Sequence, residues 1–252
     1  MTTSHNSIRK LSVVIPVFNE QSTIEEVARR VCAVDLGVIE KEVIISNDGS
    51  TDATSGIVER IQIEHAEIVR IFTSPTNLGK GAAVRLGMSL ATGDAIIIQD
   101  ADLELDPAEY SRLLAPLLNN VADVVYGSRF LHPTSTIKIR TRLANRFLTI
   151  LTNLLFGARL TDMETAYKVF RREVVAGLHL RCVRFDFEPE ITAKILMTGY
   201  RIHEVPVSYN PRTSAKGKKI SWIDGVDAVY TLLRCRFLEP KRMVTAAYAP
   251  TD

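Results

Sequence analysis

Short apolar runs alternate with amphipathic stretches along the first half of the chain. The apolar runs are bounded by polar turns and predict strands over 11–17, 42–46, 67–73, 94–99 and 122–126. The stretches between them predict helices over 22–32, 51–65, 79–91 and 107–118, with Ser22 or Thr23 and Thr51 or Asp52 as N-caps of the first two. Strands and helices that alternate in this way indicate βαβ units, and therefore a doubly wound α/β fold with a mostly parallel sheet.

The overall composition is that of an ordinary globular protein, with 46% hydrophobic and 24% charged residues among 252. A net charge of +2 argues against a nucleic-acid binder that depends on its overall field. The three cysteines lack the CxxC spacing of a metal or redox site, which is typical of reduced thiols in a cytoplasmic protein. No apolar run approaches the roughly 20 residues of a membrane span.

Two aspartates follow the predicted strand at 94–99. Residues two apart in an extended chain point to the same side, so the carboxylates of Asp100 and Asp102 can face one cation. The carboxyl end of a central parallel strand opens into the crevice where open α/β sheets bind ligands. Hard oxygen ligands at that place suit Mg²⁺ or Mn²⁺ held partly by substrate phosphates. Because an Asp-x-Asp pair is also common in turns, this hypothesis depends on the neighbouring loops.

Other predicted strands end in polar turns that suit the same crevice. The first strand ends near Asn19 and Glu20, and the second ends at Asp48, whose carboxylate can accept from a base or a ribose hydroxyl. The helix at 79–91 opens with Gly79-Lys80-Gly81, where glycines allow close backbone approach to a phosphate and the lysine adds positive charge. Each turn alone can be a helix cap, but four in register predict a nucleotide site. The P-loop and GxGxxG patterns are absent, which disfavours an ATPase or a dehydrogenase.

Four motifs together resemble the family 2 glycosyltransferases in order and spacing: Val14-Ile-Pro-Val-Phe-Asn-Glu20, Asn47-Asp-Gly-Ser-Thr-Asp52, Asn77-Leu-Gly-Lys-Gly81 and Asp100-Ala-Asp-Leu103. Three later motifs narrow the similarity to the dolichyl-phosphate mannose synthase branch: Gly127-Ser-Arg129, Asp162-Met-Glu-Thr165, and Glu204-Val-Pro-Val-Ser-Tyr209 followed by Arg212. The resemblance covers residues 11–222. It implies the A-type glycosyltransferase fold of the nucleotide-diphospho-sugar transferases. It also implies a GDP- or UDP-sugar donor, a divalent cation, and inverting transfer to a polyprenyl (dolichyl or undecaprenyl) phosphate.

The resemblance implies roles for individual positions. The residues implied in donor and cofactor binding are Pro16, Asn19, Glu20, Asp48, Lys80, Asp100 and Ala101. The implied ligands of Mg²⁺ or Mn²⁺ are Asp100, Asp102 and Glu104, the last standing where relatives often have a glutamine. Asp48 matches the acidic turn that contacts the nucleoside, although many members carry two acids where this chain has Asn47-Asp48.

The predicted catalytic residues are Asp102, Arg129, Asp162 and Arg212. By resemblance, Arg129 faces the reacting phosphates, and Arg212 with Lys218 or Lys219 lies near the acceptor phosphate. An acceptor phosphate has a second pKa of about 6, so it can attack without a general base, and positioning and charge stabilisation then carry the reaction. A hydroxyl acceptor would instead need a carboxylate base. Asp162 or Glu164 could be that base, or Asp162 could orient Arg129.

A polyprenyl acceptor requires a membrane surface. Two stretches could contact it: 140–160, where arginines flank an apolar run, and 222–237, which has apolar residues at helical spacing. The first stretch could equally be an ordinary amphipathic helix packed on the sheet. Relatives in this branch often continue into transmembrane helices, whereas this sequence ends at 252. We therefore expect a peripheral protein at the cytoplasmic membrane face, or one that relies on a membrane-embedded partner subunit.

The expected organisation is a disordered tail over 1–10, a glycosyltransferase catalytic domain over 11–222, and a C-terminal amphipathic helix with a tail over 223–252. Three functions stay open at this stage. They are transfer to a polyprenyl phosphate, transfer to a hydroxyl acceptor, and nucleotide-sugar binding without catalysis. An acidic group at Asp186, Glu188 and Glu190 either favours a helix N-terminus or supplies a sugar ligand.

Overall fold

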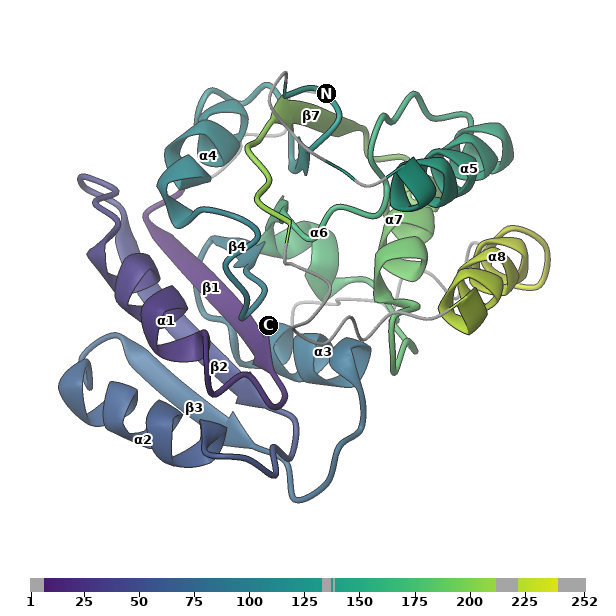
Figure 1. Ribbon diagram of the computed structural model, residues 1–252. Coiled ribbons are helices and arrows are strands. Elements are labelled where there is room, and N and C mark those ends of the chain that lie inside the picture. The colour runs from purple at the N-terminus through teal and green to yellow at the C-terminus, as the bar shows by residue number, and fades with distance from the viewer. Residues whose placement is uncertain (1–6, 133–136, 138, 212–221, 240–252) are drawn as a thin grey trace, which may run out of the picture.

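The computed structural model describes residues 7–132, 137, 139–211 and 222–239 (Figure 1). One seven-stranded sheet has the order β3-β2-β1-β4-β6-β5-β7. Its strands are β1 (Lys10–Val17), β2 (Glu40–Asn47), β3 (Val69–Thr73), β4 (Ala95–Ile98), β5 (Val124–Ser128), β6 (Lys168–Arg171) and β7 (Ile202–Pro206). β6 runs antiparallel to both of its neighbours, and the other strand pairs are parallel. The predicted doubly wound, mostly parallel fold is therefore confirmed.

The helices cover both faces of this sheet (Figure 1). They are α1 (Ile24–Ala33), α2 (Thr54–Glu64), α3 (Lys80–Leu90), α4 (Tyr110–Leu118) after the short 3-10 turn η1 (Pro107–Glu109), α5 (Ile139–Phe156), α6 (Arg172–Ala176), α7 (Phe187–Met197) and α8 (Trp222–Phe237). Two predicted N-caps differ in detail. Thr23 is the N-cap residue of α1, as predicted, but its hydroxyl donates to the Glu20 carboxylate at 3.0 Å and makes no cap hydrogen bond to the helix. Asp52 accepts from the Thr54 amide at 3.0 Å, although Ala53 is the N-cap residue of α2.

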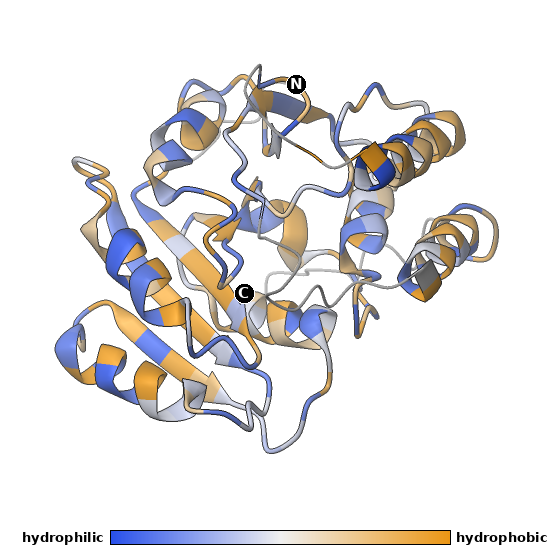
Figure 2. Cartoon of the chain, viewed as in Figure 1, coloured by the Kyte–Doolittle hydropathy of each residue, from blue (hydrophilic) through white to orange (hydrophobic). Residues whose placement is uncertain are grey.

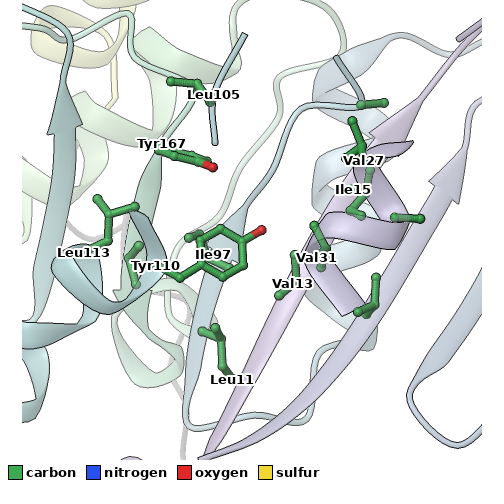
Figure 3. Close-up of a cluster of buried hydrophobic side chains, with 14 of the residues drawn as sticks. Leu11, Val13, Ile15, Val27, Val31, Ile97, Leu105, Tyr110, Leu113 and Tyr167 are labelled. Atoms are coloured by element: carbon green, nitrogen blue, oxygen red, sulfur yellow. The ribbon is translucent and has the colours of Figure 1, made fainter. Parts of the chain in front are cut away.

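The central strands are apolar on both faces because helices cover each side. On one face, Leu11, Val13 and Ile15 of β1 and Ile97 of β4 pack against α1 and α4, as Figure 3 shows. On the other face, Val14 of β1 and Ile96 and Ile98 of β4 lie in one buried cluster with Val84 of α3 and Ile191 of α7. Burial on both faces explains why these strands read as continuous apolar runs in the sequence.

β6 enters the sheet between β4 and β5, which the sequence pattern did not predict. Its first residue, Lys168, pairs with Tyr126, the middle residue of β5. Because β6 is antiparallel, the loop that precedes it lies at the carboxyl edge of β4 and β5. Asp162 and Glu164 belong to that loop, so the strand insertion brings them to the predicted crevice.

A small third core joins α5 and α8 to the rest of the fold. Leu148 of α5, Ala228 and Leu232 of α8, and Met163 are buried together there. Within the described ranges, none of the helices combines the length and apolarity that crossing a membrane requires. At the other end of the chain, Ile8 is buried and β1 begins at Lys10, so order begins before the expected boundary at residue 11. Residues 1–6 and 240–252, where tails were expected, lie outside the described residues.

Candidate active site

The carboxyl end of β4 is anchored by a buried glutamine. The Gln99 side-chain oxygen accepts from the hydroxyls of Tyr110 and Tyr167, each at 2.8 Å. Both rings are fully buried, so the chain immediately before Asp100 is fixed from two sides. The sequence analysis gave Gln99 no role. A polar amide side chain at the end of an apolar strand could have indicated a buried residue with hydrogen-bond partners elsewhere in the chain.

Lys80 bridges two acids at the centre of the carboxyl edge. Its ammonium nitrogen lies 2.9 Å from Asp100 Oδ1 and 2.9 Å from Glu188 Oε1. Burial alone would lower the pKa of Lys80, but the charges of Asp100 and Glu188 outweigh burial and raise that pKa. Lys80 therefore stays charged beside the aspartate pair, at the place that the sequence predicted for it.

The acids of the loop after β4 continue along the same edge. Asp102 is buried, and its Oδ1 accepts from the Glu104 amide at 3.1 Å. The Glu104 carboxylate accepts from the Tyr209 hydroxyl at 3.0 Å. Carboxylate oxygens are the ligands that Mg²⁺ and Mn²⁺ prefer, so the chemistry of this set fits such a cation. Ala101, between the two aspartates, is buried in the core.

The glycine loop before α3 differs from its predicted role. Its glycines pack against the protein's own backbone: a Cβ on Gly79 would lie 2.4 Å from the Val183 carbonyl oxygen, and one on Gly81 would lie 2.9 Å from that of Arg184. The Gly81 amide already donates to the Arg184 carbonyl at 2.9 Å. We predicted that these glycines admit a phosphate, and that prediction was wrong because a chain segment far away in sequence fills the space.

Asp48 holds the same loop from the other side. Its two carboxylate oxygens accept from the amides of Leu78 at 2.8 Å and Gly79 at 2.7 Å. Asp48 is almost completely buried, so it fixes the turn that leads into Lys80. The nucleoside contact predicted for Asp48 stays a prediction. Each carboxylate oxygen has a second lone pair that could accept a hydrogen bond from a nucleoside.

The loops after β1 and β2 are tied together at the same edge. Asn19 has a positive φ of 52°, its side-chain oxygen accepts from the Thr51 amide at 2.8 Å, and its own amide donates to Ser50 Oγ at 3.0 Å. Glu20 accepts from Thr23, and Pro16 pairs with β2 inside the sheet. The structure thus gathers the three residues predicted to line a nucleoside pocket, and their nucleoside contacts stay a prediction.

Arg129, at the end of β5, is held by a buried acid from the loop before β6. Its Nε donates to Asp162 Oδ2 and its Nη2 to Asp162 Oδ1, both at 2.8 Å. The guanidinium also lies over the Tyr209 ring, 5.3 Å from the ring centroid. Glu204, on β7, accepts from the Asp162 amide at 2.9 Å and so fixes the acid itself. Of the two roles left open for Asp162, this geometry is that of a residue that orients Arg129.

Glu164 lies in the same loop as Asp162, has a raised pKa and differs from Asp162 in its hydrogen bonding. Burial and the Glu188 carboxylate raise the pKa of Glu164 to about 7. Its Oε1 is buried with no hydrogen-bond partner among the described residues. Neighbouring Lys168 is fully buried and donates to the Met163 carbonyl at 3.1 Å. Glu164 is therefore the acid of this loop that is suited to proton transfer, because its pKa lies near neutrality and its Oε1 makes no hydrogen bond within the described residues.

Comparison with known families decides the class of protein. The family described as Glycosyl transferase family 2 matches residues 12–178, about two thirds of the chain. The chain belongs to glycosyl transferase family 2. This family 2 chain carries the predicted A-type nucleotide-sugar transferase fold, which is confirmed by its likeness to solved structures.

Two such structures are crystal structures of glucosyl-3-phosphoglycerate synthase from Mycobacterium tuberculosis. In the complex with UDP, identity is 22%, coverage is 90% of this chain and 80% of that chain, and the TM-score is 0.71. In the complex with Mn²⁺, UDP and phosphoglyceric acid, identity is 20%, coverage is 92% and 80%, and the TM-score is 0.71. At this identity the likeness shows the fold alone.

The structure also separates the three acids near the start of α7 in this family 2 chain. Asp186 accepts from the amides of Val183 and Arg184. Glu190 is fully buried in a cluster away from the crevice, whereas Glu188 meets Lys80 at the crevice itself. Of these three acids, Glu188 is therefore the one that lies beside Lys80. Arg212, Lys218 and Lys219 lie outside the described residues.

Proposed function

We propose that this family 2 chain transfers a sugar from a GDP- or UDP-linked donor to a polyprenyl phosphate at a membrane surface, with Mg²⁺ or Mn²⁺ as cofactor. The observation that carries the acceptor class is the pair of exposed apolar helix faces on α5 and α8. The donor side of the proposal rests on family membership and on the charges gathered at the carboxyl edge of the sheet.

The donor diphosphate is assigned to the space between Lys80 and the aspartates. Asp100 and Asp102 would hold the divalent cation, with Glu104 as a further oxygen ligand. The titles of the similar structures name UDP together with Mn²⁺ or Mg²⁺, which supports a cation of this kind. A bound cation would offset the negative charge that develops on the departing diphosphate. Lys80, released from Asp100 by that cation, would add its charge to the same phosphates.

The transfer needs one bond to form and one to break. An oxygen of the acceptor phosphate attacks the anomeric carbon, and the bond from that carbon to the nucleoside diphosphate breaks with inversion of configuration. The acceptor is already ionised near neutral pH, because its second pKa is about 6, so no residue has to remove a proton. Arg129 uses its Nε and Nη2 edge for Asp162. Its Nη1 is the donor that we assign to a substrate phosphate.

The membrane surface is assigned to two adjacent helices. Five large apolar side chains of α5 are exposed at helical spacing, and five of α8 are exposed in the same way: Ile139, Leu143, Phe147, Ile150, Leu154, Ile223, Val226, Tyr230, Leu233 and Phe237. Figure 2 shows hydrophobic residues along both helices, which lie side by side against α7. Arginines at positions 140, 142 and 146 of α5 are exposed, which suits anionic lipid headgroups.

A second candidate function follows from Glu164. A hydroxyl acceptor must lose a proton as it attacks, and a carboxylate with a pKa near the working pH suits that step. Burial and Glu188 raise the pKa of Glu164 to about 7. The similar structures include complexes with phosphoglyceric acid, a compound that carries a hydroxyl. Transfer to an alcohol of this kind is the alternative that the experiment has to separate.

The acceptor class is tested with a matched pair of lipids. The wild-type chain and Glu164→Gln are each incubated with labelled donor, Mn²⁺, and one of three acceptors: polyprenyl phosphate, the corresponding polyprenol, or phosphoglycerate. The proposal predicts label on the phosphate alone, with the rate in Glu164→Gln within about threefold of wild type. Label on the polyprenol or on added phosphoglycerate, lost in Glu164→Gln, would favour the alternative.

A further inference from the structure

The buried side of α8 is joined to α7 by ion pairs. Arg234 Nη2 lies 3.0 Å from Glu190 Oε1, and Lys194 Nζ lies 2.8 Å from the same oxygen. Glu239, just beyond α8, lies 3.1 Å from Lys194 Nζ. The side chains of Glu190 and Lys194 are fully buried, so this is a cluster that water does not screen. Glu190, Cys235 and Glu239 have the spacing of a metal site, but the two cations already neutralise it.

The second oxygen of Glu190 holds a chain segment outside both helices. Glu190 Oε2 accepts from the Arg181 amide at 2.8 Å and the Cys182 amide at 2.6 Å. Two charge-assisted bonds from one buried carboxylate fix this segment, which has no regular secondary structure. Any change in the position of Glu190 would therefore move residues 181–184.

The same segment forms the wall behind the donor site. The amides of Gly81 and Ala82, in the first turn of α3, donate to the carbonyls of Arg184 at 2.9 Å and Val183 at 3.0 Å. Arg85 of α3 donates to the Cys182 carbonyl at 3.2 Å. These bonds seat the turn that presents Lys80 to Asp100. Direct contacts of 2.6–3.2 Å thus run from α8 to the first turn of α3.

We propose that Arg234 and Glu190 are positioning residues for donor binding. Neither residue contacts the donor site directly. Each acts through segment 181–184, whose hydrogen bonds fix the position and orientation of the first turn of α3. The inference rests on the proposed function in one respect, namely that a nucleoside diphosphate binds beside Lys80. It adds that α8, the helix assigned to the membrane surface, also sets the geometry of the donor site through its opposite face.

The test compares two arginines of the same helix. Arg234→Gln removes the contact to Glu190, and Arg236→Gln removes an exposed charge of the same sign as a matched control. Two quantities are measured in the full-length chain: hydrogen exchange at the Gly81 and Ala82 amides, and the Kd of UDP and of GDP with Mn²⁺. We expect Arg234→Gln to speed exchange and to raise the Kd by about fivefold, with Arg236→Gln unchanged.

Arg234→Lys keeps the charge and serves if Arg234→Gln does not fold. It should restore at least half of the loss in log Kd, because an ammonium can reach Glu190 with one bond. The donor KM should rise with Kd while kcat stays within about twofold, which a general loss of folded protein would not produce. Unchanged exchange at Gly81 and Ala82 in the Arg234 variants would overturn the inference. A wild-type chain that binds neither UDP nor GDP would instead contradict the proposed function.

Discussion

Both carboxylate oxygens of Asp162 accept hydrogen bonds from Arg129, at 2.8 Å from Nε and 2.8 Å from Nη2, and Asp162 is completely buried. The two residues come from different elements, the end of β5 and the loop before β6. The antiparallel insertion of β6 is what brings them together. This pair decides where the guanidinium points, so a catalytic role for Arg129 depends on Asp162.

Asp162→Asn should therefore act through Arg129. The variant leaves a buried guanidinium without its counter-charge, which typically costs about 3–5 kcal/mol of stability. We expect a lower melting temperature and a loss of activity of at least about tenfold, because Arg129 is no longer held in place. The residual activity should keep the pH profile of the wild type. Disappearance of the acidic limb of that profile would mean that Asp162 is a general base.

Asp102→Ala tests the predicted cation site. We expect Mn²⁺ affinity and activity each to fall by at least about tenfold. Mutation of residues that only hydrogen-bond to metal ligands typically has an effect of this size, so loss of a ligand itself should cost at least as much. Asp106→Ala is the matched control, since Asp106 lies in the same loop but is exposed and caps η1. Calorimetric titration with Mn²⁺ measures the affinity. A loss below tenfold in Asp102→Ala, or an equal loss in both variants, would contradict the assignment.

Glu164→Gln should change how stability depends on pH. The pKa of Glu164 is raised from 4.5 to about 7, so between these values the folded protein keeps a proton that the unfolded chain has lost. Through Glu164, the free energy of unfolding therefore falls as pH rises through this interval. Glutamine does not titrate, so the variant gains stability relative to wild type between pH 5 and pH 8. Urea unfolding at both pH values checks this, and a constant difference would mean that the pKa is not raised.

Acidic substitutions on α5 and α8 should weaken membrane binding. Phe147→Asp with Tyr230→Asp places two charges among exposed apolar side chains that face away from the core. We expect binding to vesicles with anionic lipid to fall by at least about tenfold, since two apolar contacts are lost and two anions are repelled. Ile63→Asp on α2, also highly exposed, is the control. Equal flotation of both variants and wild type would exclude this surface.

Strands β1, β2, β4 and β5 could be predicted because helices cover both faces of the sheet there, so most of their residues are buried and each contains a run of consecutive apolar residues. The edge strand β3 is mostly exposed, and only its first residue, Val69, is buried. The turns at the carboxyl ends of these strands followed from topology, which places the ends of parallel strands at one edge. β6 escaped prediction because its four residues begin with Lys168 and end with Arg171. Both are buried: Lys168 donates to the Met163 carbonyl in the loop just before β6, and Arg171 pairs with the carboxylate of Asp123, which lies far away in the sequence.

The roles within the site were harder to predict than its location. Gly79 and Gly81 read as a phosphate loop, yet they admit a backbone segment about a hundred residues away. Tyr209 was part of a recognised motif without a role, and its ring and hydroxyl prove to contact Arg129 and Glu104. In each case the partner lies far away in the sequence, so spacing alone could not identify it.

The most direct test of the account is a transfer assay with three labelled donors. The purified chain is incubated with short-chain polyprenyl phosphate and GDP-mannose, UDP-glucose or UDP-N-acetylglucosamine, with Mn²⁺ or with a chelator. The account predicts label in the lipid fraction from one donor, dependent on the metal. Metal-dependent binding of a donor without label in the lipid, but with transfer to a hydroxyl compound, would contradict it.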